Sequence, residues 1–244
     1  ETTISQSRPD RDAEIRHVPD FSGYKTIKEK KRAFFDFLSP VIKAENDKII
    51  AERKRLISLK EKLYRQITLT RQDSLALEEL AVKYRVKMQP DDLKKVVSVL
   101  EKRINPVPYR LALAQAANES QWGRSRFSRE GNNLFGIWCF EKGCGIVPKN
   151  RPQGLTHEVA SYETVNASVS AYLRILNRNE KFHKFRQLRF QALSMHVKPK
   201  AIDLAEGLES YSERGIEYVD EIKAMIKKNY ELMGTSYHKN AIAG

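Results

Sequence analysis

The sequence lacks several features that would identify particular classes of protein. It contains only two cysteines, Cys139 and Cys144, whereas a structural metal site needs about four ligands. The histidines show no ligand spacing with these cysteines, and no GxxxxGK(S/T) phosphate-binding loop is present. No apolar run approaches the roughly 20 residues that cross a bilayer. The sequence therefore predicts no metal, no cofactor and no transmembrane segment.

Positive charge, in contrast, is abundant. Lys and Arg number 44 against 31 Asp and Glu, which gives a net charge of +13. Such a charge predicts attraction to polyanions, which include nucleic acid, anionic membranes and an acidic cell wall. Much of the excess is interleaved with Glu along expected helices, as on a solvated face, and no basic recognition motif accompanies it. We therefore expect no nucleic-acid partner.

The two cysteines stand at the ends of the segment CFEKGC, with Lys142 and Gly143 supplying a turn between them. This spacing favours a small-loop disulfide in an oxidising compartment over two free thiols. Such a bridge would fix the local shape of a hairpin more than it would raise global stability.

The first part of the chain is expected to be helical after a polar start. Residues 1–20 lack a pattern and are expected to be a flexible lead-in. Residues 21–89 are expected to form a helical region, in which Pro40 interrupts an early pattern. Beyond it, apolar residues recur about every seven positions without Gly or Pro up to residue 69, which predicts a long amphipathic helix. A coiled coil is the alternative, but Glu45 and Glu52 at seam positions favour packing on its own domain.

Residues 90–235 show helical patterns on both sides of a glycine-rich stretch. A buried helix is expected from Tyr109 to about Ser120, because apolar residues occupy all sides of it between Leu111 and Ala117. Five of the 11 glycines fall between residues 131 and 154, which predicts a small β-lobe. Helical patterns then return, and residues 236–244 form a tail. The predicted fold class is α+β and predominantly helical.

One acid, Glu119, stands at the end of the buried helix, close to the only two tryptophans, Trp122 and Trp138. Burial would favour the protonated carboxyl, which could donate a proton to a glycosidic oxygen, and aromatic faces could stack on sugar rings. Gln115 would share the helix face of Glu119. The alternative is an acid bonded to backbone donors at a helix end, with both tryptophans in the core.

The stretch LALAQAANESQWGRSRFSREGNNLFGIW resembles the signature of bacterial glucosaminidases of glycoside hydrolase family 73. WCFEKGCGIVP and HEV resemble the Bax-type branch of that family. Segments 161–172 and 208–219 resemble two further segments of the family and follow in the same order along the chain. They differ from the family pattern in two ways: Ala171 replaces a common Asp, and the second segment is one residue longer than in the family. The resemblance covers about residues 90–235. It implies a lysozyme-like catalytic domain with a small β-lobe and a cleft, preceded here by N-terminal helices.

The resemblance also implies roles for particular residues. Glu119 would be the general acid and Tyr211 a catalytic hydroxyl of the cleft, with ordinary core packing as the alternative for Tyr211 and for Tyr162. The family's second carboxylate is expected in the β-lobe, where Glu158 is favoured and Glu141 is the alternative, although the substrate's own acetamido group could replace either. The expected substrate-binding residues are Gln115, Trp122, Asn133, Phe135, Gly136, Trp138 and Tyr162, with Asn133 and Gly136 shaping the cleft floor.

The function that follows is an endo-β-N-acetylglucosaminidase that cleaves peptidoglycan glycan strands in the periplasm or cell envelope. Since the chain starts at Glu1, we expect an export segment to have been removed. A lytic transglycosylase shares the fold and the Glu-Ser dipeptide, but usually carries a GLMQ-like segment where NLFGIW stands here. An alternative of another class is a weak or inactive wall-binding scaffold, with the N-terminal helices as a candidate contact for another envelope component.

Overall fold

The computed structural model describes residues 14–234, so the predictions for residues 1–13 and for the tail 236–244 lie outside it. The chain divides into two compact units, each assembled from separate segments. The first unit comprises the chain up to Ala44, Tyr109–Ser170 and the chain from Asp220, and the second comprises Glu45–Pro108 and Ala171–Val219. Three of the four limits of this division fall inside continuous helices, and the expected catalytic domain over residues 90–235 stays a prediction.

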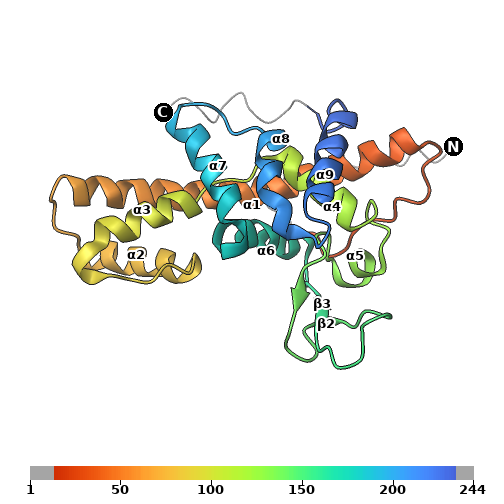
Figure 1. The fold of residues 1–244 in the computed structure, drawn as a ribbon, viewed down its shortest axis with the longest axis horizontal. Helices are drawn as coiled ribbons and strands as arrows, with labels where there is room; N and C mark the ends of the chain where they lie inside the picture. Colours follow the sequence, from red (N-terminus) through yellow and green to blue (C-terminus); the bar gives the residue numbers. More distant parts are fainter. Residues whose placement is uncertain (1–13, 235–244) are drawn as a thin grey trace. The chain divides into compact units, whose positions relative to one another are not determined.

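The described chain is mostly helical with one small sheet (Figure 1), which confirms the predicted α+β class. Its α-helices are α1 (Ile27–Tyr64), α2 (Arg71–Lys83), α3 (Leu93–Arg103), α4 (Tyr109–Glu119), α5 (Arg126–Gly131), α6 (Val165–Arg178), α7 (His183–Ser194), α8 (Ala201–Leu204) and α9 (Ile216–Lys228). Its 3-10 helices are η1 (Pro90–Asp92), η2 (Glu180–Phe182) and η3 (Ala205–Tyr211). Within residues 14–234, no helix combines the length and the apolar character that a membrane crossing requires.

Helix α1 begins earlier than the sequence pattern predicts. The Thr26 hydroxyl accepts from the Glu29 N–H at 3.1 Å, and the Glu29 carboxylate accepts from the Thr26 N–H at 3.0 Å, which forms a capping box. Pro40 lies inside α1 and does not interrupt it. Proline removes one helical hydrogen bond, but Leu38 and Ile42 on either side are fully buried, so packing keeps this stretch helical.

The segment Glu14–Phe21, which we call the strap, is packed on the first unit. The Ile15 N–H donates to Asn166 Oδ1 at 3.0 Å, and the Ile15 carbonyl accepts from the Val165 N–H at 2.7 Å. Phe21 is buried. The expectation of a flexible lead-in therefore fails over residues 15–20, because bonds to residues about 150 positions away hold the backbone.

Helix α4 lies in the core of the first unit. Tyr109 and every residue from Leu111 to Ala117 are buried, as the apolar pattern predicts. Glu119 is the last residue of the helix and is partly exposed. Glu119 is thus an acid at the point where a buried helix reaches the surface.

The predicted β-lobe contains three short antiparallel strands, β1 (Trp138–Cys139), β2 (Gly145–Ile146) and β3 (Glu158–Ala160), with β3 in the centre. Trp138 pairs with Val159, and Gly145 pairs with Ala160. A Cβ at Gly145 would lie 2.0 Å from the Val159 carbonyl oxygen. Glycine is therefore required here for β2 to approach β3.

In the second unit, a buried arginine joins α7 to the end of α3. The Arg189 guanidinium is almost fully buried and donates to the carbonyls of residues 102, 103, 105 and 106. The bonds to residues 102 and 103 satisfy carbonyl groups that the end of α3 leaves without helical partners. Desolvation by burial lowers the pKa of Arg189 to about 9.

Candidate functional site

The chain reverses sharply directly after Glu119. Gln121, Trp122 and Gly123 have φ values of 52°, 62° and 76°, all in the left-handed region. The Ser120 hydroxyl donates to the Ala116 carbonyl at 2.6 Å and accepts from the Gly123 N–H at 2.8 Å, which closes the turn. Two consecutive non-glycine residues in this conformation store strain, and such strain collects at functional sites.

The backbone of Gly136 lies against the carboxyl group of Glu119. A Cβ at position 136 would lie 3.1 Å from Glu119 Oε2. Gly136 is exposed and has a φ of 63°, where other residues are strained. A side chain at this position would cover the carboxyl group, so glycine leaves this side of Glu119 accessible to a ligand.

Asn133 holds the turn that carries Gly136. Its side-chain amide donates to the carbonyls of Ile137 and Ala160, both at 2.8 Å. Its Oδ1 accepts from the N–H groups of Phe135 at 3.3 Å and Ile137 at 3.0 Å. Phe135 is fully buried. Asn133 and Phe135 are thus buried within this turn, whereas Gly136 is exposed, and substrate contact by the three residues stays a prediction.

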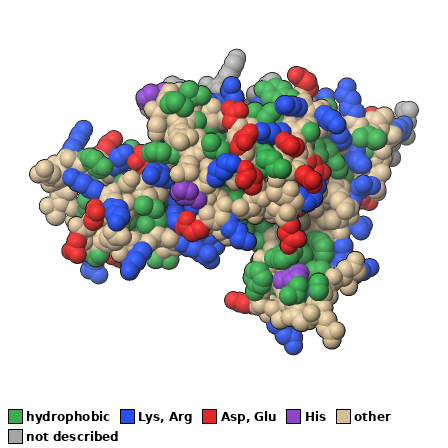
Figure 2. Space-filling view, viewed as in Figure 1, with side chains coloured by type: hydrophobic (Ala, Val, Ile, Leu, Met, Phe, Trp, Pro, Cys, Tyr) green, Lys and Arg blue, Asp and Glu red, His purple; other side chains and the backbone are tan. Residues whose placement is uncertain are grey.

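Trp138 forms an exposed aromatic surface on the lobe. The residue is 54% exposed and its ring stacks on the His157 ring, with centroids 4.1 Å apart and planes 13° apart. Figure 2 shows hydrophobic side chains gathered around a histidine on the lobe. His157 was not among the predicted site residues. The signal was its position directly before β3, two residues before Val159, which pairs with Trp138, because side chains two positions apart lie on the same face of an extended chain.

Trp122 lies in an aromatic cluster at the start of α1. Its ring meets those of Phe34 and Phe35 edge-on, with centroid distances of 5.8 Å and 5.3 Å. Lys31 Nζ lies 4.8 Å from the Trp122 ring centroid. This environment is that of a packed ring, and substrate contact by Trp122 stays a prediction.

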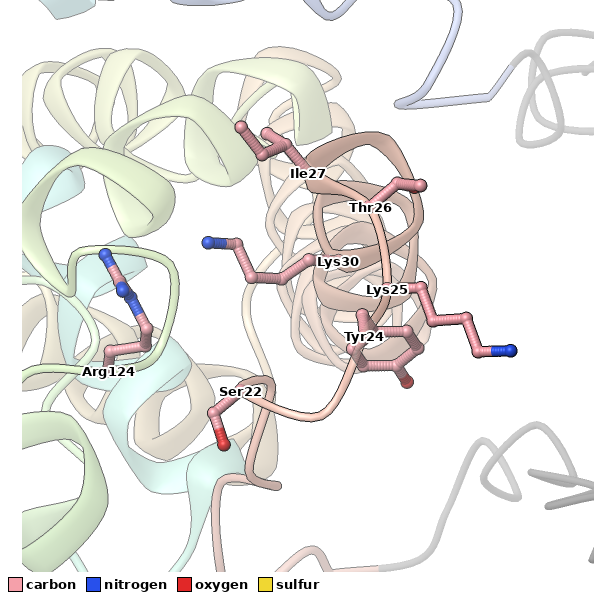
Figure 3. A pocket seen from close by; sticks show the side chains of 7 residues that line it. All are labelled: Ser22, Tyr24, Lys25, Thr26, Ile27, Lys30 and Arg124. Atoms are coloured by element: carbon pink, nitrogen blue, oxygen red, sulfur yellow. The ribbon is translucent and has the colours of Figure 1, made fainter.

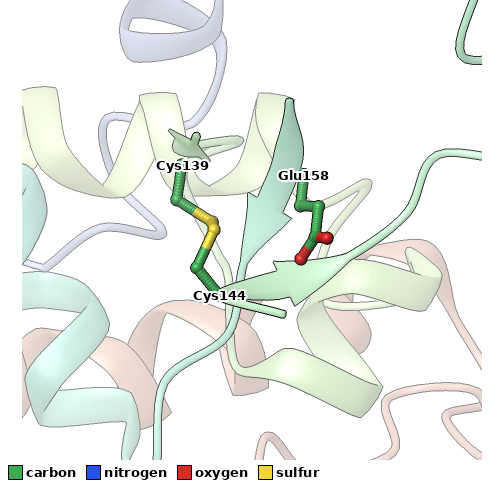
Figure 4. Close-up of side chains that lie close together, drawn as sticks. All are labelled: Cys139, Cys144 and Glu158. Carbon is green, nitrogen blue, oxygen red and sulfur yellow. A yellow bond between two sulfur atoms is a disulfide. The ribbon is translucent and has the colours of Figure 1, made fainter. Parts of the chain in front are cut away.

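Glu158 lies beside a disulfide between Cys139 and Cys144 (Figure 4). Its carboxylate accepts from the Gly143 N–H at 3.0 Å and from the Gly145 N–H at 2.8 Å, and these bonds lower the pKa of Glu158. The ligand atoms of the three side chains lie within 4.8 Å of one another. The two sulfurs are bonded to each other, so neither is a thiolate that could bind a metal.

The other expected site residues occupy three different places. Gln115 is fully buried one turn before Glu119 on α4. Tyr162 stands at the base of the lobe, where its N–H donates to the Gly131 carbonyl at 2.9 Å. Tyr211 belongs to the second unit and stacks on Tyr218 with centroids 5.5 Å apart. Glu141, the alternative second acid, is exposed in the disulfide loop.

A cationic cavity of about 190 Å³ lies between the start of α1 and Arg124. Lys25, Lys30 and Arg124 are among its lining residues. The Lys30 side chain extends toward the side of Arg124, whereas Lys25 points away (Figure 3). Within residues 14–234, none of the three forms an ion pair. Their charge therefore adds to the positive field of the first unit.

Comparison with known proteins identifies a family and a relative. The family model described as "Mannosyl-glycoprotein endo-beta-N-acetylglucosaminidase" matches residues 94–231, more than half of the chain. The chain is 31% identical over 221 residues to "Protein bax" of Escherichia coli (strain K12), covering 91% of this chain and 77% of that protein. No solved structure gives a significant match. All the expected site residues lie inside the span that the family model matches.

Proposed function

Because the chain belongs to this glucosaminidase family of glycosidases, we propose that it hydrolyses the β-1,4 bond after N-acetylglucosamine in peptidoglycan. The observation that carries this proposal is the carboxyl group of Glu119, partly exposed at the end of a buried helix and against the bare backbone of Gly136. A glycoside hydrolase needs a carboxylic acid that reaches the scissile oxygen. The family relationship makes a glycan the substrate.

Glu119 is the proposed general acid. Its carboxyl would protonate the oxygen of the leaving sugar while the glycosidic bond breaks. The position of Gly136 supports this role, because the space that a side chain would fill lies 3.1 Å from Oε2. A sugar oxygen can occupy that space at hydrogen-bond distance.

Glu158 remains the predicted second carboxylate. Its backbone hydrogen bonds lower its pKa, which keeps it ionised at neutral pH. An ionised carboxylate suits a base or a charge-stabilising group, not an acid. The same two bonds hold residues 143–145 and favour a positioning role for Glu158. In that case the substrate's 2-acetamido group would act as the nucleophile.

The exposed ring of Trp138 is the proposed sugar platform of the lobe. An aromatic face packs well against the C–H groups of a pyranose ring, and ligand sites are commonly lined by such rings. His157 fixes the orientation of the indole by stacking on it at 4.1 Å. From the family relationship alone, we also propose that the hydroxyl groups of Tyr211 and Tyr162 line the cleft.

The periplasm or cell envelope is the proposed location. A disulfide between Cys139 and Cys144 suits an oxidising compartment. The net charge of +13 and the cations around the cavity at the start of α1 suit a cell wall that carries carboxylates. We also propose that the N-terminal helices contact another component of the cell envelope.

The test is the release of reducing sugar ends from purified peptidoglycan by the parent chain and by Glu119→Gln. Glu130→Gln, at an exposed position on α5, is the matched control. We expect the parent and the control to cleave and Glu119→Gln to be folded, by circular dichroism, but inactive. Equal activity of the parent and Glu119→Gln would refute the assignment.

The products separate the alternative functions. Anhydro-sugar ends in the mass spectrum would make the protein a lytic transglycosylase. If neither the parent nor the variant cleaves but both bind sacculi, the wall-binding scaffold becomes the better description.

A further inference from the structure

The strap ends against the turn that follows Glu119. A Cβ at Gly123 would lie 2.9 Å from the ring of Phe21 and 3.3 Å from a methyl group of Val18. Both residues are buried, and Phe21 is only 1% exposed. The Phe21 ring also meets that of Phe34 with centroids 5.5 Å apart, and Phe34 meets Trp122. The strap therefore supports Gly123 directly and Trp122 through one intervening ring.

The other end of the strap is bonded to the base of the β-lobe. The Asn132 side chain donates to the Arg16 carbonyl at 2.8 Å and to the Tyr162 carbonyl at 2.9 Å. Ile15 exchanges hydrogen bonds with Val165 and Asn166 at the start of α6. Asn132 directly precedes Asn133, which fixes the turn of Gly136. One short segment thus contacts both chain stretches whose approach brings Glu119 against Gly136.

The turn after Glu119 requires outside support. Gln121 and Trp122 occupy left-handed conformations, which persist only where the surroundings hold them. Phe21, Val18 and the aromatic residues of α1 are those surroundings. If the strap were loosened, the turn could relax, and the last residue of α4 would no longer be held in one place.

We propose that the strap is a positioning element for the Glu119 site. Phe21 and Val18 hold the turn Gln121–Gly123, and the backbone of Ile15 and Arg16 holds the base of the lobe. Together these contacts fix the carboxyl group of Glu119 relative to Gly136. The effect on turnover rests on the proposed hydrolase function, whereas the effect on the turn does not.

The test uses the full chain with Phe21→Ala, and with Phe21→Leu as the conservative variant that refills most of the space. Val18→Ala, a smaller change on the same contact, serves if Phe21→Ala fails to fold. Phe185→Ala, which removes a fully buried ring from the second unit, controls for loss of stability alone. Two readouts are measured: hydrogen exchange of the amides of residues 120–124, and kcat and KM on peptidoglycan.

We expect Phe21→Ala to accelerate exchange in this turn and to lower kcat by about 100-fold with little change in KM, because a small misplacement of a catalytic group has that effect. Phe21→Leu should restore most of both, and Phe185→Ala should leave exchange in the turn unchanged. Unchanged exchange in the turn of the strap variants, or an unchanged kcat, would overturn the proposal. If the parent itself releases no sugar ends, faster exchange still supports the strap while the hydrolase function fails.

Discussion

Gly136 combines a backbone conformation that favours glycine with a position against a carboxyl group. Its φ of 63° would cost an alanine about 1 kcal/mol of stability. The proximity to Glu119 Oε2 is a separate effect, because it concerns access to the acid. The two effects can be separated, since Gly154 has a φ of 88° and a Cβ added there would meet no atom within 4 Å.

We therefore expect Gly136→Ala to lower glycan cleavage by about tenfold or more, because its methyl group would occupy the place of the substrate oxygen and shift the acid. Gly154→Ala should lose similar stability but keep its activity. Thermal unfolding and reducing-end release measure the two effects. Equal activity in the two variants would show that Gly136 serves only the backbone.

Glu158 forms hydrogen bonds that its residue type alone does not predict. Hydrogen bonds from the Gly143 and Gly145 N–H groups lower its pKa in the folded state. A lowered carboxyl pKa stabilises the fold at pH values above the unfolded pKa of about 4.3. That stabilisation is lost as the pH falls through the lowered folded value.

At the scale of the element, the β-lobe should therefore loosen in acid. We expect exchange of the Gly143 and Gly145 amides to accelerate as the pH falls below about 4.3, beyond the intrinsic pH dependence of exchange. Glu158→Gln should exchange faster at neutral pH and lack this additional acid transition. Glu141→Gln, a neighbouring change at an exposed position, is the control.

The activity of the same variant separates the two roles of Glu158. If Glu158→Gln is inactive while the loop amides keep the protection of the parent, the carboxylate takes part in the reaction. If activity and protection fall together, Glu158 is a positioning residue of the disulfide loop.

At the scale of the whole molecule, the net charge of +13 should govern the encounter with the cell wall. Salt shortens the range of such attraction from about 10 Å at 0.1 M to about 3 Å at 1 M. We expect KM for sacculi to rise with salt while kcat at saturation changes little. Cosedimentation with sacculi and initial rates measure this, and binding that is independent of salt would contradict it.

The same charge is distributed over both units, so no single cluster needs to carry the attraction. Replacing Lys30 and Arg124 by alanine and, separately, Lys227 and Lys228 by alanine removes the same charge from two places. Equal effects on KM would show that the attraction to the wall arises from the net charge of the molecule and not from one cluster. A larger effect of the first pair would identify the cavity at the start of α1 as a contact.

The sequence by itself determined the features that depend on local pattern. The mostly apolar stretch from Leu111 to Ala117 predicted a buried helix, and the glycines from residue 131 to residue 154 predicted the β-lobe. The placement of Glu119 at the end of that helix followed from the same pattern. Helical periodicity and turn chemistry act over a few residues, so they can be read along the chain.

Only the tertiary structure decided which distant residues meet. The approach of Gly136 to Glu119, the stacking of His157 on Trp138, and the bonds of the strap join positions 17 to 151 residues apart. The tertiary structure also decided that α1 continues through Pro40, because the burial of neighbouring residues outweighs the tendency of proline to end a helix. Such contacts depend on how the packed helices and the lobe fill space together, which no local pattern specifies.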